Sequence, residues 1–153
     1  MLLGLHTYSL NLHGIGQAWA GFTLPWPRQI STFQLMGLAR EWGLDGLHID
    51  DGVLETLEAP FLAEVRAAAA EHGLYLEYNF SMDLGGFGVG IQHEIPAAIE
   101  TAEALGADVV KVGMELRRPR PLAASRFHPE VIGALELVAA RLRDAAPLAQ
   151  AAG

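Results

Sequence analysis

Two residues that could do chemistry, His48 and Asp50, stand two positions apart at the end of the apolar segment LDGLHID. Successive side chains of a β-strand point to opposite faces, so residues two apart share one face. An imidazole and a carboxylate placed in this way could orient a sugar hydroxyl or support the ligands of a metal from outside. The structural alternative is a polar pair whose hydrogen bonds are satisfied. We take both as candidate catalytic residues.

A second candidate pair is formed by Glu77 and Lys111, which stand in the later segments LYLEYNF and DVVKVG. If these segments are neighbouring strands, burial and mutual proximity would shift the pKa values of both groups, as in an acid/base pair. A structural ion pair between the two strands is the competing interpretation.

Candidates for substrate binding lie on the same predicted strand faces or in the long loop after the first segment. Aromatic rings in that loop could fold over a substrate or pack on the rim of the site, since loops of this length are usually functional or disordered. The candidates are His6, Tyr8, Trp19, Trp26, Asn79, Ser81 and Glu115.

The elements that must position these residues alternate between strands and helices. Short segments rich in Leu, Ile, Val or Tyr predict strands over residues 2–8, 46–50, 74–80 and 108–114. Helices are predicted over residues 32–42, 60–72, 94–105 and 129–144, with a shorter one over 146–152 because Pro147 should break the last helix. This alternation indicates parallel βα units, since parallel neighbours need a crossover connection.

The ends of the predicted helices carry recognisable signals. Ser31 and Gln34 have the spacing of a capping box, in which each side chain bonds to the backbone N–H of the other residue. Gly43, Gly73 and Gly106 suit the left-handed position just after a helix. These signals support the predicted boundaries.

Each predicted strand has one apolar and one polar face. Leu47 and Ile49 share the apolar face of their strand, while His48 and Asp50 share the other. Strands of an open doubly wound sheet are covered on both faces and read as nearly continuous apolar runs. A barrel fits better, because its inner face can be polar toward the carboxyl ends of the strands, where barrel active sites lie.

Composition excludes several classes of protein. The chain of 153 residues has no cysteine, which excludes disulfides and thiolate chemistry, and its length suits one domain. No segment approaches the roughly 20 apolar residues of a membrane span, and no signal peptide is recognisable. A formal net charge of -8 disfavours nucleic acid as a partner. We therefore expect a cytoplasmic protein without a membrane or nucleic-acid partner.

Several segments carry a resemblance to a known family. The stretches GLHTYSL, LAREWGLDGLHI, AAEHGLYLE and AIETAEALGADVVKVG, in this order, resemble the sugar phosphate isomerase/epimerase superfamily with its xylose isomerase-like TIM barrel. The segment PLAQAAG resembles the stretch before that family's fifth strand. The resemblance covers residues 1–153 as the amino-terminal half of the family's domain.

This resemblance implies an enzyme that moves a proton or a hydride between adjacent carbons of a sugar or sugar phosphate. It also implies a divalent metal, such as Mn, Mg, Co or Zn, whose ligands come mainly from strands beyond residue 153. We therefore assign no metal ligand among the residues of this chain. The family often has a glutamate late in its second strand, where this sequence has His48.

A (β/α)₈ barrel needs eight strands and about 250 residues, and four strands are predicted here. Either a second copy closes the barrel in a homodimer, or the chain is the first half of a longer protein. We expect the four units alone to be a poor catalyst. Two other functions stay open: a non-enzymatic α/β module that binds sugars, and a barrel that cleaves DNA at abasic sites.

Overall fold

The fold is an α/β arrangement with one parallel sheet. The structure, a computed structural model, describes residues 1–7, 10, 30–50, 52–83, 94–115 and 128–153. Among these residues the strands β1 (Gly4–His6), β2 (Gly46–Asp50), β3 (Tyr75–Asp83) and β4 (Val109–Glu115) form one sheet in the order β1-β2-β3-β4. All three neighbouring pairs are parallel. The predicted alternation of strands and helices is confirmed.

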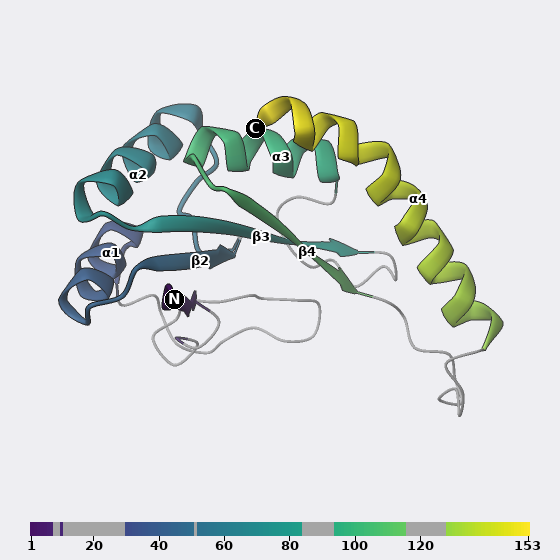
Figure 1. Cartoon of the computed structure of the whole chain (residues 1–153), viewed down its shortest axis with the longest axis horizontal. Helices are drawn as coiled ribbons and strands as arrows, with labels where there is room; N and C mark the ends of the chain where they lie inside the picture. Colours follow the sequence, from purple (N-terminus) through teal and green to yellow (C-terminus); the bar gives the residue numbers. More distant parts are fainter. Residues whose placement is uncertain (8–9, 11–29, 51, 84–93, 116–127) are drawn as a thin grey trace.

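The helices α1 (Thr32–Glu41), α2 (Ala59–His72) and α3 (Ile95–Leu105) connect successive strands and lie on one side of the sheet (Figure 1). Their buried residues pack against the apolar faces of β2 and β3 in one core, whose largest fully buried side chains include Tyr78, Phe80, Leu35, Met36, Leu47 and Ile49. Because side chains alternate along a strand, Leu47 and Ile49 point toward the helices, and His48 and Asp50 point to the opposite face.

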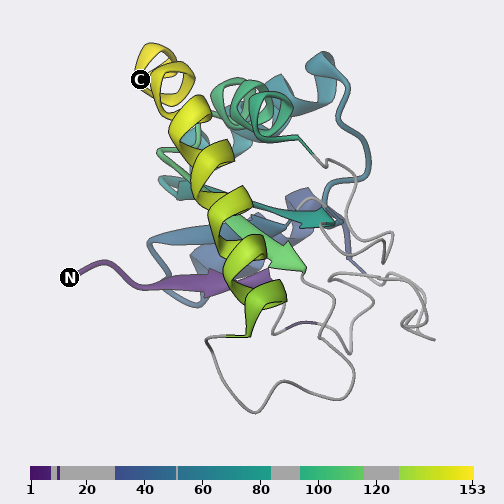
Figure 2. The same ribbon diagram turned by 90° about the vertical axis from the view of Figure 1, so that its right-hand side faces the viewer.

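The last helix, α4 (Pro129–Ala152), is one continuous helix, so the predicted break at Pro147 is wrong. Proline lacks the N–H that would donate to the carbonyl of Arg143, but both residues are exposed, and water can satisfy that carbonyl. Figure 2 shows the C-terminal part of α4 beside α3, while its N-terminal part extends away from α3.

The helix ends follow the sequence signals. Ser31 and Gln34 form the capping box at the start of α1, with both reciprocal hydrogen bonds present. Gly43, Gly73 and Gly106 have φ values of 72°, 66° and 68°, which is the left-handed conformation that glycine adopts without steric cost.

The first strand is shorter than predicted. It covers Gly4–His6 rather than residues 2–8, because only these residues pair with β2, at Gly46–His48. Leu3, which lies within the predicted strand 2–8, precedes the observed strand and is 64% exposed.

A tyrosine explains two glycines near the start of the sheet. Gly4, Gly46 and Tyr75 are register partners on adjacent strands, and the ring of Tyr75 occupies the space that side chains at both glycines would need. A Cβ at Gly46 would overlap Cδ1, Cε1 and Cγ of the Tyr75 ring. The two glycines therefore leave room for the ring of Tyr75 to lie across β2 and β1.

Candidate functional site

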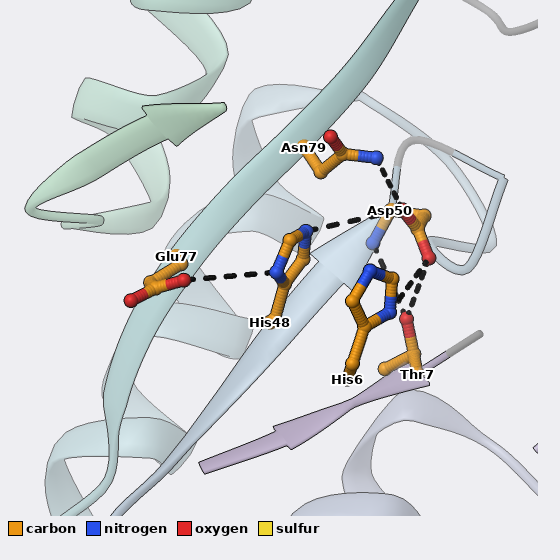
Figure 3. A network of polar contacts seen from close by, with 6 residues as sticks. All are labelled: His6, Thr7, His48, Asp50, Glu77 and Asn79. Atoms are coloured by element: carbon orange, nitrogen blue, oxygen red, sulfur yellow. Dashed lines mark hydrogen bonds and ion pairs between the residues drawn. The ribbon is translucent and has the colours of Figure 1, made fainter. Parts of the chain in front are cut away.

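The polar residues predicted on the strand faces gather on the side of the sheet opposite α1, α2 and α3. Register pairs His6 with His48 and His48 with Glu77, and the next row pairs Asp50 with Asn79 and Asn79 with Lys111. Paired residues of parallel strands point to the same face. Figure 3 shows six residues of this region converging around Asp50.

Asp50 lies at the centre of the network and is 1% exposed. Its Oδ2 accepts a hydrogen bond from the hydroxyl of Thr7 at 2.9 Å, and its Oδ1 accepts one from Nδ2 of Asn79. These donors compensate part of the cost of burying a carboxylate. They also fix the direction in which its oxygens point.

Two imidazoles face the same carboxylate. His6 Nδ1 lies 3.8 Å from Asp50 Oδ2, and His48 Nε2 lies 4.0 Å from Asp50 Oδ1. The two rings are stacked, with centroids 4.0 Å apart and an interplanar angle of 23°. Both rings therefore present a nitrogen to one buried carboxylate.

The other nitrogen of His48 is directed at Glu77. Nδ1 lies 3.6 Å from Glu77 Oε2, and this carboxylate is 37% exposed (Figure 3). A carboxylate beside Nδ1 favours the tautomer with its proton on Nδ1. Nε2 is buried and has no hydrogen-bond partner among the described residues.

The pKa of His48 is lowered from its ordinary value of 6.5. Burial is the main cause, because it disfavours the charged imidazolium, and the nearby charges of His6 and Lys111 act in the same direction. Asp50 and Glu77 oppose this shift without cancelling it. The neutral imidazole, which can accept a proton or bind a metal, is therefore favoured at neutral pH.

A second buried polar atom without a hydrogen-bond partner among the described residues belongs to Asn79. Oδ1 of Asn79 accepts no hydrogen bond from the described residues, while Nδ2 of the same amide is held by Asp50. An unpaired buried acceptor is costly, so a ligand donor such as a hydroxyl would stabilise it.

One group of side chains among the described residues has donor atoms placed to hold a metal ion. His6, His48 and Asp50 each offer one ligand atom, and these atoms lie within 4.8 Å of one another. The sequence analysis assigned no metal ligand in this chain and took His48 and Asp50 as candidate catalytic residues that could orient a sugar hydroxyl or support metal ligands from outside. His6 completes a set with two nitrogen donors and one oxygen donor.

Glu77 and Lys111, the predicted acid/base pair, lie on the adjacent strands β3 and β4. Glu77 Oε2 lies 3.6 Å from His48 Nδ1, and Lys111 is an exposed residue beside Asn79 in the register. The charge of Lys111 still acts on His48, whose pKa it lowers.

Some predicted site residues cannot be placed in this network. Tyr8, Trp19 and Trp26 lie outside the described residues. Ser81 and Glu115 lie in β3 and β4, where the structure describes their backbone but not their side chains.

Thr7 is a member of the network that sequence reasoning missed. Strand alternation assigns residue 7 to the face opposite His6, but β1 ends at His6, so the alternation no longer applies. Thr7 is fully buried and bonds to Asp50, which lies 43 positions later. No local pattern in the sequence predicts this contact.

A shallow groove of about 200 Å³ lies elsewhere, between α3 and α4. Pro96 and Leu148 line it, and Arg141 spans it in an ion pair with Glu94 at 3.6 Å. This groove lies within the helical layer, away from the polar strand face. Across the described ranges, no helix is both long enough and apolar enough to cross a bilayer.

Comparison with known proteins adds no assignment. No family model matches the sequence, and no curated protein is significantly similar to it.

Proposed function

We propose that this chain forms the first four βα units of a (β/α) barrel that isomerises or epimerises a sugar or sugar phosphate. The observation that carries the proposal is the polar cluster around Asp50, in which His48 Nε2 and Asn79 Oδ1 are buried without hydrogen-bond partners among the described residues. Asn79 pairs with Asp50, the last residue of β2, and barrel enzymes bind their substrates at the carboxyl ends of their strands.

A barrel is favoured over a doubly wound sheet by the distribution of the helices. The helices that pack on the sheet cover one face, and buried polar residues occupy the other (Figure 1). A doubly wound sheet would have helices on both faces. The remaining strands of the barrel would come from a second copy of the chain or from a longer chain.

The buried polar atoms suit a polyhydroxylated substrate. Oδ1 of Asn79 is an acceptor for a substrate hydroxyl, and Asp50 holds the amide in the orientation that presents this oxygen. Because the side chains of Asp50 and Asn79 are already fixed by each other, little conformational entropy is lost when a substrate binds.

Glu77 and Lys111 are the groups that we assign to proton transfer. Both lie on the polar face, and both are less buried than Asp50, so a substrate can reach them. A carboxylate can remove a proton beside a carbonyl, and an ammonium can stabilise or protonate the oxygen that becomes negative. Their placement diagonally on β3 and β4 brings them to the same part of the face.

The family that the sequence resembles uses a divalent metal to polarise the substrate carbonyl. Among the described residues, His6, His48 and Asp50 are the group whose ligand atoms lie close enough together to hold a metal ion. We propose a small sugar or sugar phosphate as the partner, a cytoplasmic location, and a homodimer if two copies close the barrel.

The test uses nuclear magnetic resonance and a panel of aldoses, ketoses and their phosphates. At least one sugar should shift the side-chain signals of Asn79 and His48, and Asn79→Ala should weaken its binding by about 1–3 kcal/mol because the buried acceptor is lost. In heavy water the protein should catalyse slow uptake of deuterium at the carbon next to the carbonyl, and Glu77→Gln should abolish this exchange.

Asp108→Asn is the matched control, because Asp108 is an exposed carboxylate before β4 and should leave both readouts unchanged. Sugar binding without any deuterium uptake would indicate a binding module and contradict the enzyme proposal. Absence of binding by every sugar in the panel would contradict both.

A further inference from the structure

Two imidazole nitrogens face the carboxylate of Asp50 at distances longer than a hydrogen bond. His48 Nε2 and Asp50 Oδ1 face each other at 4.0 Å, and His6 Nδ1 faces Oδ2 of the same carboxylate at 3.8 Å. These distances are too long for hydrogen bonds. Ligand atoms around a tetrahedral zinc ion are about 3.3 Å apart when the bonds are about 2.0–2.1 Å.

Glu77 prepares His48 to act as a ligand. With the proton held on Nδ1 by Glu77 at 3.6 Å, the lone pair of Nε2 points toward Asp50. A lone pair and a carboxylate oxygen repel each other unless a proton or a cation lies between them. Histidines that bind metals usually have a carboxylate beside their other nitrogen, and Glu77 occupies this place, with an electrostatic contact at 3.6 Å.

The carboxylate of Asp50 is also oriented by its neighbours. Thr7 and Asn79 each donate to one of its oxygens, so the carboxylate is oriented before any ion arrives. Each oxygen still has a lone pair for a further partner, because an ionised carboxylate can accept about four hydrogen bonds in all.

We propose that His6, His48 and Asp50 bind one divalent transition-metal ion, with Glu77, Thr7 and Asn79 holding the ligands in position. His48 is 9% exposed, and its Nε2, which has no hydrogen-bond partner among the residues that the structure describes, is directed into the group; this is the independent sign of a ligand. The three ligand atoms lie within 4.8 Å of one another, so they have to approach by at most about 1.5 Å to reach bonding geometry.

The donor set selects the class of metal. Two imidazole nitrogens with one carboxylate oxygen suit zinc and its first-row neighbours, whereas magnesium and calcium prefer oxygen ligands. Three protein ligands leave at least one coordination position for water or for a substrate oxygen. His6 is 39% exposed, so this position is approachable from the side of β1.

This site differs from the ligand set that the family resemblance implies, which lies beyond residue 153. The proposal also stands independently of the isomerase reaction, because it concerns the binding of a metal alone. Failure to bind zinc would leave the proposed substrate contacts of Asn79 untouched.

The experiment is calorimetric titration of the chelator-treated chain with Zn²⁺, repeated with Co²⁺ to record the visible spectrum of the bound ion. We expect one ion per chain, a cobalt spectrum with nitrogen and oxygen ligands, and no competition from excess Mg²⁺. Glu77→Gln should weaken binding by about 10- to 100-fold as the loss of an outer partner does, and His6→Gln should weaken it further.

His72→Gln is the matched control, since His72 lies at the end of α2 in the helical layer. His6→Gln is the main ligand variant because His6 is partly exposed and its loss should not unfold the chain, which circular dichroism checks. Zinc binding that survives His6→Gln and Glu77→Gln, or that is lost in His72→Gln, would place the ion elsewhere and overturn the proposal. So would the absence of zinc binding at micromolar concentration.

Discussion

The hydroxyl of Thr7 donates a 2.9 Å hydrogen bond to Asp50 Oδ2, joining the end of β1 to the end of β2. The backbone N–H of Asp50 also lies 3.4 Å from the same hydroxyl oxygen. Thr7 is fully buried and Asp50 is 1% exposed, so water cannot replace either contact. This pair fixes the carboxylate on which the whole polar cluster converges.

Thr7→Val should therefore destabilise the fold by about 1.5–3 kcal/mol, the usual contribution of a buried hydrogen bond to a charged group. Valine keeps the shape of the side chain and removes only the hydroxyl. Urea unfolding measures the difference. Thr7→Ser keeps the hydroxyl and should cost less; equal losses for the two variants would show that the hydrogen bond contributes nothing.

His48 should titrate below 6.5 in the metal-free protein, chiefly because burial disfavours its charged form. In the unfolded chain histidine titrates near 6.5, so between the two pKa values the unfolded state binds more protons. Stability should then be complete above pH 6.5 and fall as the pH drops toward the folded pKa. Proton resonances of the His48 ring give the folded value.

The control for this prediction is His48→Gln, which should show a weaker dependence of stability on pH just below 6.5. A His48 pKa at or above 6.5 would contradict the burial argument.

Gly46→Ala should destabilise the protein by about 1–3 kcal/mol, because its Cβ would overlap the ring of Tyr75 at the start of β2 and β3. Tyr75→Ala should remove most of this penalty in the double variant, which a double-mutant cycle measures. Gly133→Ala is the control: among the described residues no atom outside the local helix backbone lies within 4 Å of the added Cβ, and α4 should gain up to about 1 kcal/mol. If the stability changes of Gly46→Ala and Tyr75→Ala were additive in the double variant, the proposed overlap between residue 46 and the Tyr75 ring would be refuted.

Pro147→Ala should stabilise the chain by about 1–3 kcal/mol, because it restores an N–H donor inside the continuous helix α4. Thermal unfolding followed by circular dichroism measures the gain. Pro129→Ala is the comparison, since Pro129 lies in the first turn, where the missing N–H has no cost. A Pro147→Ala variant no more stable than the Pro129→Ala variant would contradict the account of α4.

Sequence reasoning predicted the strands and most of the helices because their signals are local. Alternation along β2 separated His48 and Asp50 from Leu47 and Ile49, and the structure places the two sets on opposite faces. The glycines after α1, α2 and α3 marked the helix ends for a similar reason, since a left-handed residue needs no information from elsewhere in the chain.

The errors arise where tertiary context decides. Pro147 is tolerated because the carbonyl it leaves unpaired is exposed, and exposure cannot be read from the helix sequence alone. Thr7 belongs to the site because β1 ends at His6. The length of β1 depends on its pairing with β2, which a local pattern does not predict. The contact of Glu77 with His48 on β2 likewise depends on the pairing of β2 with β3 and has no local signal in the sequence.

The central claim is that His6, His48 and Asp50 form one metal-binding group on the polar face of the sheet. A crystal of the chain grown with zinc, measured on both sides of the zinc absorption edge, tests it most directly. The account predicts one strong anomalous peak within about 2.0–2.2 Å of a nitrogen of His6, Nε2 of His48 and an oxygen of Asp50. A map whose zinc peaks all lie away from these three side chains, or that has none, would contradict it.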